Sequence, residues 1–154
     1  MISQRSRYAL KALLHLAQAP RGAVLRAREI AEAENIPEAF LDQILVDLRR
    51  AGLIESRRGK TGGHLLSKPP ELVTLANVLR SIEGPVAPVT CLSRTAYKSC
   101  ADCADERTCA LRRLFRETHE ATLQVLEHRT LADIVDAARG GKAAPMDFFL
   151  GANI

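Results

Sequence analysis

The chain of 154 residues contains no tryptophan, and aromatic residues make up only 4% of it. A hydrophobic core must therefore be built from Leu, Ala, Ile and Val, a composition that favours helices. No apolar run approaches the roughly 18 residues that a membrane-spanning helix needs, and the residues after Met1 are polar, unlike a signal peptide. We therefore expect a cytoplasmic protein without a membrane partner.

Cysteine is also scarce, but all four cysteines lie in one stretch with the spacing C-x8-C-x2-C-x5-C: Cys91, Cys100, Cys103 and Cys109. In a reducing compartment, clustered cysteines are more often metal ligands or redox sensors than disulfides. Four thiolates suit an iron–sulfur cluster or a tetrahedral zinc ion equally well, and a metal-free thiol switch is a third possibility. Because the stretch has little apolar surface to bury, we expect a loop that a ligand or partner chain must order.

The length permits one compact domain of about 100 residues plus an appendage. The net charge is +4, and its surplus is N-terminal: residues 1–70 hold 12 Lys+Arg against 7 Asp+Glu, whereas residues 71–154 hold 10 against 11. This asymmetry is expected if the N-terminal half binds a polyanion. A solvated basic face without a partner explains the charge equally well.

Apolar spacing predicts helices over residues 6–17, 26–34 and 37–51. The third has a core stripe of Phe40, Leu41, Ile44, Leu45 and Leu48, and an opposite face that carries Ala39, Asp42, Gln43 and Val46. A short helix, a tight turn and a second, two-faced helix are typical of a helix-turn-helix, in which the second helix enters the major groove of DNA. The alternative is an ordinary helical hairpin packed in a core.

The next segment favours the DNA-binding interpretation. Residues 53–56 and 64–67 read as two short strands, joined by a glycine-rich tip that carries Arg57, Arg58 and Lys60. Such a hairpin is typical of a wing that contacts phosphates or the minor groove. The tip also matches the end of a Walker motif, but Ile54 occupies the position of the required earlier glycine, so we do not expect a nucleotide-binding loop.

Further helices are predicted over residues 74–83, 110–128 and 130–138. The long one carries a near-heptad stripe, which includes Leu111, Leu114, Phe115, Thr118, Thr122 and Val125. A second copy of the chain would cover this stripe in a homodimer, although packing against the same chain is possible. We expect four parts: a winged helix-turn-helix domain (1–84), a cysteine-bearing sensor loop (85–110), dimerisation helices (111–139) and a flexible tail (140–154).

With these elements, the sequence resembles the Rrf family of bacterial winged-helix transcriptional regulators, whose branches include IscR, NsrR, RirA and CymR. The likeness runs from Arg7-Tyr8-Ala9-Leu10 through Leu53-Ile54, Arg58-Gly59, Gly62-Gly63 and the cysteine loop to about Val135. The resemblance implies a mainly α fold, with a winged helix-turn-helix domain and a long C-terminal dimerisation helix. It also implies a homodimeric repressor or activator that binds operator DNA and senses iron–sulfur status, iron, nitric oxide or redox state.

The resemblance carries over to particular cysteines. Cluster-binding relatives use three cysteines, and Cys91, Cys103 and Cys109 match them. Some relatives add a histidine three residues beyond the last cysteine, where this chain has Arg112, so Cys100 becomes the leading candidate for the fourth ligand. Both a 2Fe-2S and a 4Fe-4S cluster are compatible with this set.

The same comparison assigns DNA-contacting positions. The recognition-helix residues used by relatives fall on Ala39, Asp42 and Gln43, with Arg58 in the wing. Gln43 can pair with adenine and Asp42 can accept from cytosine N4, whereas Ala39 offers only a methyl contact. Arg57 and Lys60 are better placed to contact backbone phosphate.

We therefore expect a dimeric transcriptional regulator whose affinity for its operator is controlled by an iron–sulfur cluster. The alternatives are a zinc-stabilised or thiol-switch regulator without a cluster, and a winged-helix module that binds another protein. An enzyme is not expected, because the sequence offers no combination of nucleophile, base and orienting group.

Overall fold

The structure is a computed structural model that describes residues 2–140; residues 141–154, which include nearly all of the expected flexible tail, lie outside the described part. The chain is mainly helical, as predicted, and the winged helix-turn-helix is confirmed. The elements are α1 (Gln4–Gln18), α2 (Ala27–Glu34), α3 (Glu38–Arg50), β1 (Ile54–Arg57), β2 (Gly63–Leu66), η1 (Pro70–Leu72), α4 (Leu75–Glu83), η2 (Thr90–Leu92), α5 (Ala110–His128) and α6 (Leu131–Ala138).

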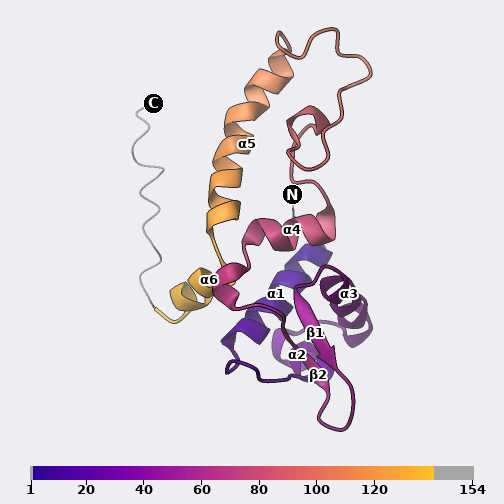
Figure 1. Cartoon of the computed structure of the whole chain (residues 1–154), viewed down its shortest axis with the longest axis vertical. Helices are drawn as coiled ribbons and strands as arrows, with labels where there is room; N and C mark the ends of the chain where they lie inside the picture. The colour runs from indigo at the N-terminus through magenta and orange to yellow at the C-terminus, as the bar shows by residue number, and fades with distance from the viewer. Residues whose placement is uncertain (1, 141–154) are drawn as a thin grey trace.

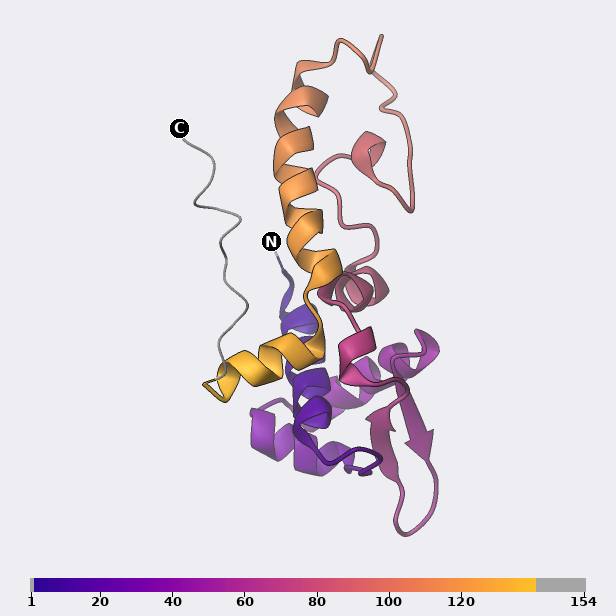
Figure 2. The ribbon, with the colours of Figure 1, turned by 60° about the vertical axis from the view of Figure 1, so that its left-hand side comes forward.

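The elements form two parts of different shape. Helices α1 to α4, the hairpin and α6 gather at one end, while α5 extends away from them beside the segment that carries the cysteines (Figures 1 and 2). No helix among residues 2–140 is both long and apolar enough to cross a membrane.

The core of the gathered part joins the apolar stripes of its helices. Leu13 of α1, Ile30 of α2 and Leu48 of α3 are fully buried in one cluster, as the spacing predicts. Phe40, however, does not belong to the core stripe as expected: it is 49% exposed, and its ring meets the edge of the Tyr8 ring at a centroid distance of 5.9 Å. The next residue, Leu41, is fully buried, so Phe40 lies at the edge of the apolar stripe, where the helix surface turns toward solvent.

The turn between α2 and α3 sets the angle of the recognition helix. Asn35 adopts a left-handed conformation (φ 52°), which asparagine tolerates and which ends α2. Ile36 is buried, and its N–H donates to the Ala31 carbonyl at 2.9 Å. Pro37 then starts α3 in a new direction. This tight connection packs α2 against α3 and leaves one face of α3 outward.

The wing is an antiparallel hairpin in which Ile54 pairs with Leu66 and Arg57 with Gly63. A further bridge joins Leu25 to His64. A β-carbon at position 63 would lie 2.4 Å from the Leu25 carbonyl oxygen, so only glycine permits this close approach. The base of the wing is thereby attached to the segment that precedes α2.

Helix α6 returns to the winged part. Expected from the sequence to belong with the dimerisation helices (111–139), it packs against α1 and η1, and its Leu131 is fully buried in the core. Two backbone hydrogen bonds of 2.9 Å hold its start, from Leu75 N to Arg129 O and from Leu131 N to Val73 O. The sensor loop and α5 thus form one continuous segment that leaves the winged part at α4 and returns to it at α6.

Candidate functional site

The outer face of α3 carries the residues expected to read DNA. Ala39, Asp42 and Gln43 are all exposed, one to two turns into the helix, while Leu41 and Leu45 on the other face are buried. The two-faced pattern predicted from the sequence therefore places three short or polar side chains outward, where they can reach base edges in a major groove.

The wing tip carries the expected cations. Arg57, Arg58 and Lys60 are exposed at the end of the hairpin. Arg26, which the sequence did not single out, donates from its guanidinium to the Lys60 carbonyl at 3.2 Å and so supports the tip from the start of α2. The sequence could have indicated this role of Arg26 only through its place as a cation immediately before α2.

The wing and the recognition helix are close enough to interact electrostatically. Burial lowers the pKa of His64 on β2, while Asp42 of α3 raises it and Arg49 lowers it. The Ser56 hydroxyl and His64 Nδ1 lie 3.0 Å apart across the hairpin. Because its pKa is lowered, the His64 imidazole of the wing is neutral near neutral pH and adds no charge beside α3.

The four cysteines lie in one loop beside α5 (Figure 1), and the shifts of their pKa values group them as two neighbouring pairs, Cys91 with Cys100 and Cys103 with Cys109. Burial raises the pKa of the Cys100 thiol, and the Cys91 thiol raises it further through its charge and a hydrogen bond. Burial also raises the pKa of Cys103, as does its hydrogen-bonded neighbour Cys109. The pairs also influence each other, because Cys109 contributes to the shift of Cys100.

The four thiols are chemically suited to a thiophilic metal, but in this structure they lie too far apart to bind one together. Cys91 is buried and the other three thiols are half-buried and free of disulfides. Within residues 2–140, no three His, Cys, Asp or Glu side chains lie close enough together to hold a metal ion. Four mutually repelling thiolates fit an iron–sulfur cluster chemically, since a bound cation offsets that repulsion. Ligation would require the loop to draw the two pairs together.

A polar network holds the loop to the start of α5. Glu106 accepts from the Tyr97 hydroxyl at 2.5 Å and also from the Arg112 guanidinium. The Arg112 Nε is buried with no partner among the described residues. At this position, where the sequence resemblance raised the possibility of a histidine ligand, the Arg112 guanidinium pairs with a carboxylate of the loop.

Glu127 joins three parts of the molecule. One carboxylate oxygen lies 2.5 Å from the Arg80 guanidinium of α4, and the other lies 3.4 Å from that of Arg94 in the sensor loop. The Arg80 hydrogen bond is the main reason that the pKa of Glu127 is lowered, with smaller contributions from Arg94 and His128. This junction was not predicted, because charged residues 33 and 47 positions from Glu127 carry no local pattern.

Helix α5 has two different apolar faces. One, with Leu123, is buried against the rest of the chain. The other is the predicted dimerisation stripe: Leu111 and Leu114 are 60% and 67% exposed, Thr118 and Thr122 are exposed, and Phe115 and Val125 are half-buried. An exposed apolar stripe of this kind is typical of a helix that pairs with another chain.

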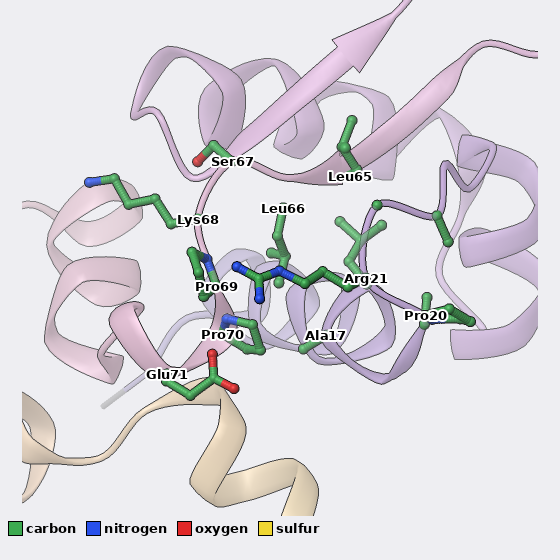
Figure 3. A pocket seen from close by; sticks show the side chains of 14 residues that line it. Ala17, Pro20, Arg21, Leu65, Leu66, Ser67, Lys68, Pro69, Pro70 and Glu71 are labelled. Atoms are coloured by element: carbon green, nitrogen blue, oxygen red, sulfur yellow. The ribbon is translucent and has the colours of Figure 1, made fainter.

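A cavity of about 390 Å³ lies on the winged part between the end of α1 and the segment after β2. Figure 3 shows Arg21 extending toward Pro69 and Pro70, while Lys68 points away. The charged side chains that line it are exposed, so we assign no ligand to this cavity.

Comparison with known proteins gives consistent matches over nearly the whole chain. The model of the Rrf2 family, described as an iron-dependent transcriptional regulator, matches residues 2–137. An rrf2-like HTH-type transcriptional regulator of Rhodobacter capsulatus is 44% identical over 149 residues, which cover 95% of this chain and 98% of that protein.

Solved structures of CymR proteins are similar over most of the chain. The structure of CymR, the global cysteine regulator of Bacillus subtilis, matches with a TM-score of 0.74 and 31% identity, covering 89% of this chain and 97% of its own. The oxidised form of Staphylococcus aureus CymR matches with a TM-score of 0.67 and 28% identity, covering 88% and 96%.

Proposed function

Because the chain belongs to the Rrf2 family of transcriptional regulators, we propose that it is a cytoplasmic homodimer whose affinity for a DNA operator depends on an iron–sulfur cluster. Cys91, Cys100, Cys103 and Cys109 would hold the cluster. When bound, it supplies an oxidation-sensitive crosslink between the two thiol pairs. The remaining steps are carried by the chain's own residues.

DNA reading is assigned to α3 and the wing. Gln43 would form a bidentate pair with adenine, Asp42 would accept from a cytosine amino group, and Ala39 would contact a thymine methyl. Arg58 would enter the minor groove, while other wing-tip cations, Arg57 and Lys60, would bind phosphates. All six side chains are exposed on the winged part, and this exposure supports the assignment.

Four thiols in one loop are the reason that a metal-bound group is proposed ahead of a thiol switch. Burial and the neighbouring thiols raise the pKa values of Cys100 and Cys103, so these two are protonated near neutral pH when no metal is bound. A metal centre displaces these protons and stabilises the thiolates. The description of the family as iron-dependent supports the same choice.

The Glu127 junction is the observation that carries the proposed coupling. Arg94 lies in the loop three residues beyond Cys91, Glu127 lies near the end of α5, and Arg80 lies on α4 of the winged part. A change in loop position would alter the Arg94–Glu127 contact and thereby the restraint on Arg80. The angle between α5 and the winged part would change, and with it the spacing of two recognition helices in a dimer.

The test begins with protein purified without oxygen. We expect visible absorption, with iron and acid-labile sulfide in comparable amounts. A DNA target selected from a random pool is then titrated by fluorescence anisotropy before and after cluster removal, and we expect the affinities to differ by about tenfold or more. Equal affinities would contradict the coupling, and colourless protein with stoichiometric zinc would replace the cluster by a structural metal.

A thiol switch is the second candidate, because each cysteine already has a sulfur neighbour. Oxidation of a pair such as Cys91–Cys100 would form one disulfide and release two protons and two electrons to a peroxide, which is reduced to water. The similarity to the oxidised form of S. aureus CymR gives this candidate a structural relative. Mass spectrometry of peroxide-treated, metal-free protein would show disulfides at 91–100 and 103–109, with altered DNA affinity.

A further inference from the structure

A second cavity lies where α5 meets the winged part. Its volume is about 510 Å³, within the range of small-molecule sites. Its walls come from α4, from the segment that leads out of α4, and from the inner side of α5. The apolar part of the wall is formed by Ile2, Leu79, Val86, Ala87, Pro88 and Leu126.

One buried polar side chain in this wall has no explanation in the fold. His119 is only 6% exposed, and its Nε2 atom has no hydrogen-bond partner among the described residues. Buried polar atoms in folded proteins almost always have a partner, because an unpaired one costs free energy. His119 is one of two polar residues buried this deeply on α5 and the sensor loop; the other is Ser93, whose hydroxyl accepts from Ala96 N at 3.0 Å.

We propose that this cavity binds a small, uncharged molecule with an apolar body and a single hydroxyl group that pairs with His119. The apolar walls suit the body, and a hydroxyl can either donate to or accept from an imidazole nitrogen, whichever tautomer is present. Glu83 at the edge of the cavity has a pKa lowered to about 2, mainly by hydrogen bonding with Ser3, so it is negatively charged and disfavours acidic ligands.

Two features make the site accessible to such a molecule. The Nε2 atom is covered by neighbouring atoms, but rotation of a histidine ring about its last bond is soft, so a modest turn presents it to the cavity. Thr118 and Thr122 belong both to the cavity wall and to the exposed stripe of α5. A second copy packed on that stripe would close the open side of the cavity around a ligand.

The test uses the full chain and a matched pair of probes, 4-methylphenol and p-xylene, which have nearly the same shape but differ in the hydroxyl group. Binding is followed by NMR with ¹⁵N-labelled histidine. We expect 4-methylphenol to bind about threefold to tenfold more tightly than p-xylene, the contribution of one hydrogen bond. It should also shift the ring nitrogen signals of His119.

Two variants locate the effect. His119→Phe should abolish the preference for 4-methylphenol, whereas His128→Phe, at an exposed position on the same helix, should leave it unchanged. Equal affinity for the two probes, or a preference that survives His119→Phe, would overturn the proposal. Absence of binding by both probes would overturn it too. If His119→Phe does not fold, the unmodified protein provides the test: 4-methylphenol must shift the ring nitrogen signals of His119, and unchanged signals would overturn the proposal.

Discussion

The winged part and the sensor loop differ in what holds them in place. In residues 4–83, leucine, isoleucine and valine side chains from several helices are fully buried in one cluster. In residues 85–109, only Cys91 and Ser93 are buried, and the loop is attached through ion pairs such as Arg94–Glu127 and the bonds of Glu106. Apolar burial gives a rigid scaffold, whereas a few polar contacts leave a segment whose position can change at low cost.

The largest expected effect breaks the winged scaffold. Leu48→Ala removes a fully buried side chain and should lower the free energy of unfolding by about 2–5 kcal/mol, because a cavity is left in the core. Tyr97→Ala, in the sensor loop, should lower it by less than about 0.5 kcal/mol. Urea denaturation followed by circular dichroism measures both. Similar decreases in the free energy of unfolding for the two variants would show that the loop contributes as much to stability as the core does.

The next effect concerns the exposed stripe of α5. Leu114→Asp should convert a dimer to monomers and weaken self-association by about a hundredfold or more, since each dimer gains two charges in an apolar contact. Gln124→Asp, on an exposed face away from the stripe, should leave the dimer intact. Sedimentation velocity distinguishes the two outcomes. A dimeric Leu114→Asp variant would mean that dimers form through another surface.

A substitution in the wing should weaken DNA binding without changing the stability of the fold. Arg58→Ala should weaken operator binding by about 1–3 kcal/mol, while the thermal midpoint stays unchanged, because the side chain is exposed. Arg116→Ala removes an exposed cation from α5 and serves as the control. Anisotropy titrations at fixed salt report both. If Arg116→Ala weakened binding as much as Arg58→Ala, the effect would be one of net charge rather than of the wing.

The junction between the two parts should show a smaller effect. Glu127→Gln keeps the shape of the side chain but removes the charge that attracts Arg80 and Arg94. We expect the ratio of DNA affinities between the cluster-loaded and cluster-free forms to fall by about fivefold, or about 1 kcal/mol, with iron content unchanged. Glu117→Gln, exposed on the same helix, is the control. An unchanged ratio would exclude this route of coupling.

The smallest effect is a pH dependence at the start of α1. Glu83 accepts a hydrogen bond from Ser3 N at 2.8 Å, and its pKa is lowered from 4.5 to about 2. Because the folded-state pKa is lowered, this stabilisation is present above pH 4.5 and is lost as the pH falls toward 2. The thermal midpoint of Glu83→Gln should differ from that of the unmodified protein at pH 6 and converge with it near pH 2. Glu55→Gln should show no such convergence.

Much of the fold follows from local pattern. The helices, the turn after Asn35 and the glycine-rich wing lie within a few residues of their predicted positions, because periodicity, capping and glycine placement act over short distances. The outward faces of α3 and α5 were also predictable, since a helix with one apolar stripe presents its other side to solvent. The exposure of Phe40 was not, because its spacing is that of the stripe, and only the packing of neighbouring elements decides how far around the helix the core extends.

Residue identity and spacing were enough to predict the class of protein, the outward face of α3 and the four-thiol loop, because each depends on neighbours within one or two turns of chain. Contacts between distant segments were decided by packing alone. These include the pairing of Cys91 with Cys100, the return of α6 to the core, the Arg80–Glu127–Arg94 junction and the burial of His119. Each brings together side chains whose separation along the chain carries no periodic signal, so only the folded arrangement reveals them.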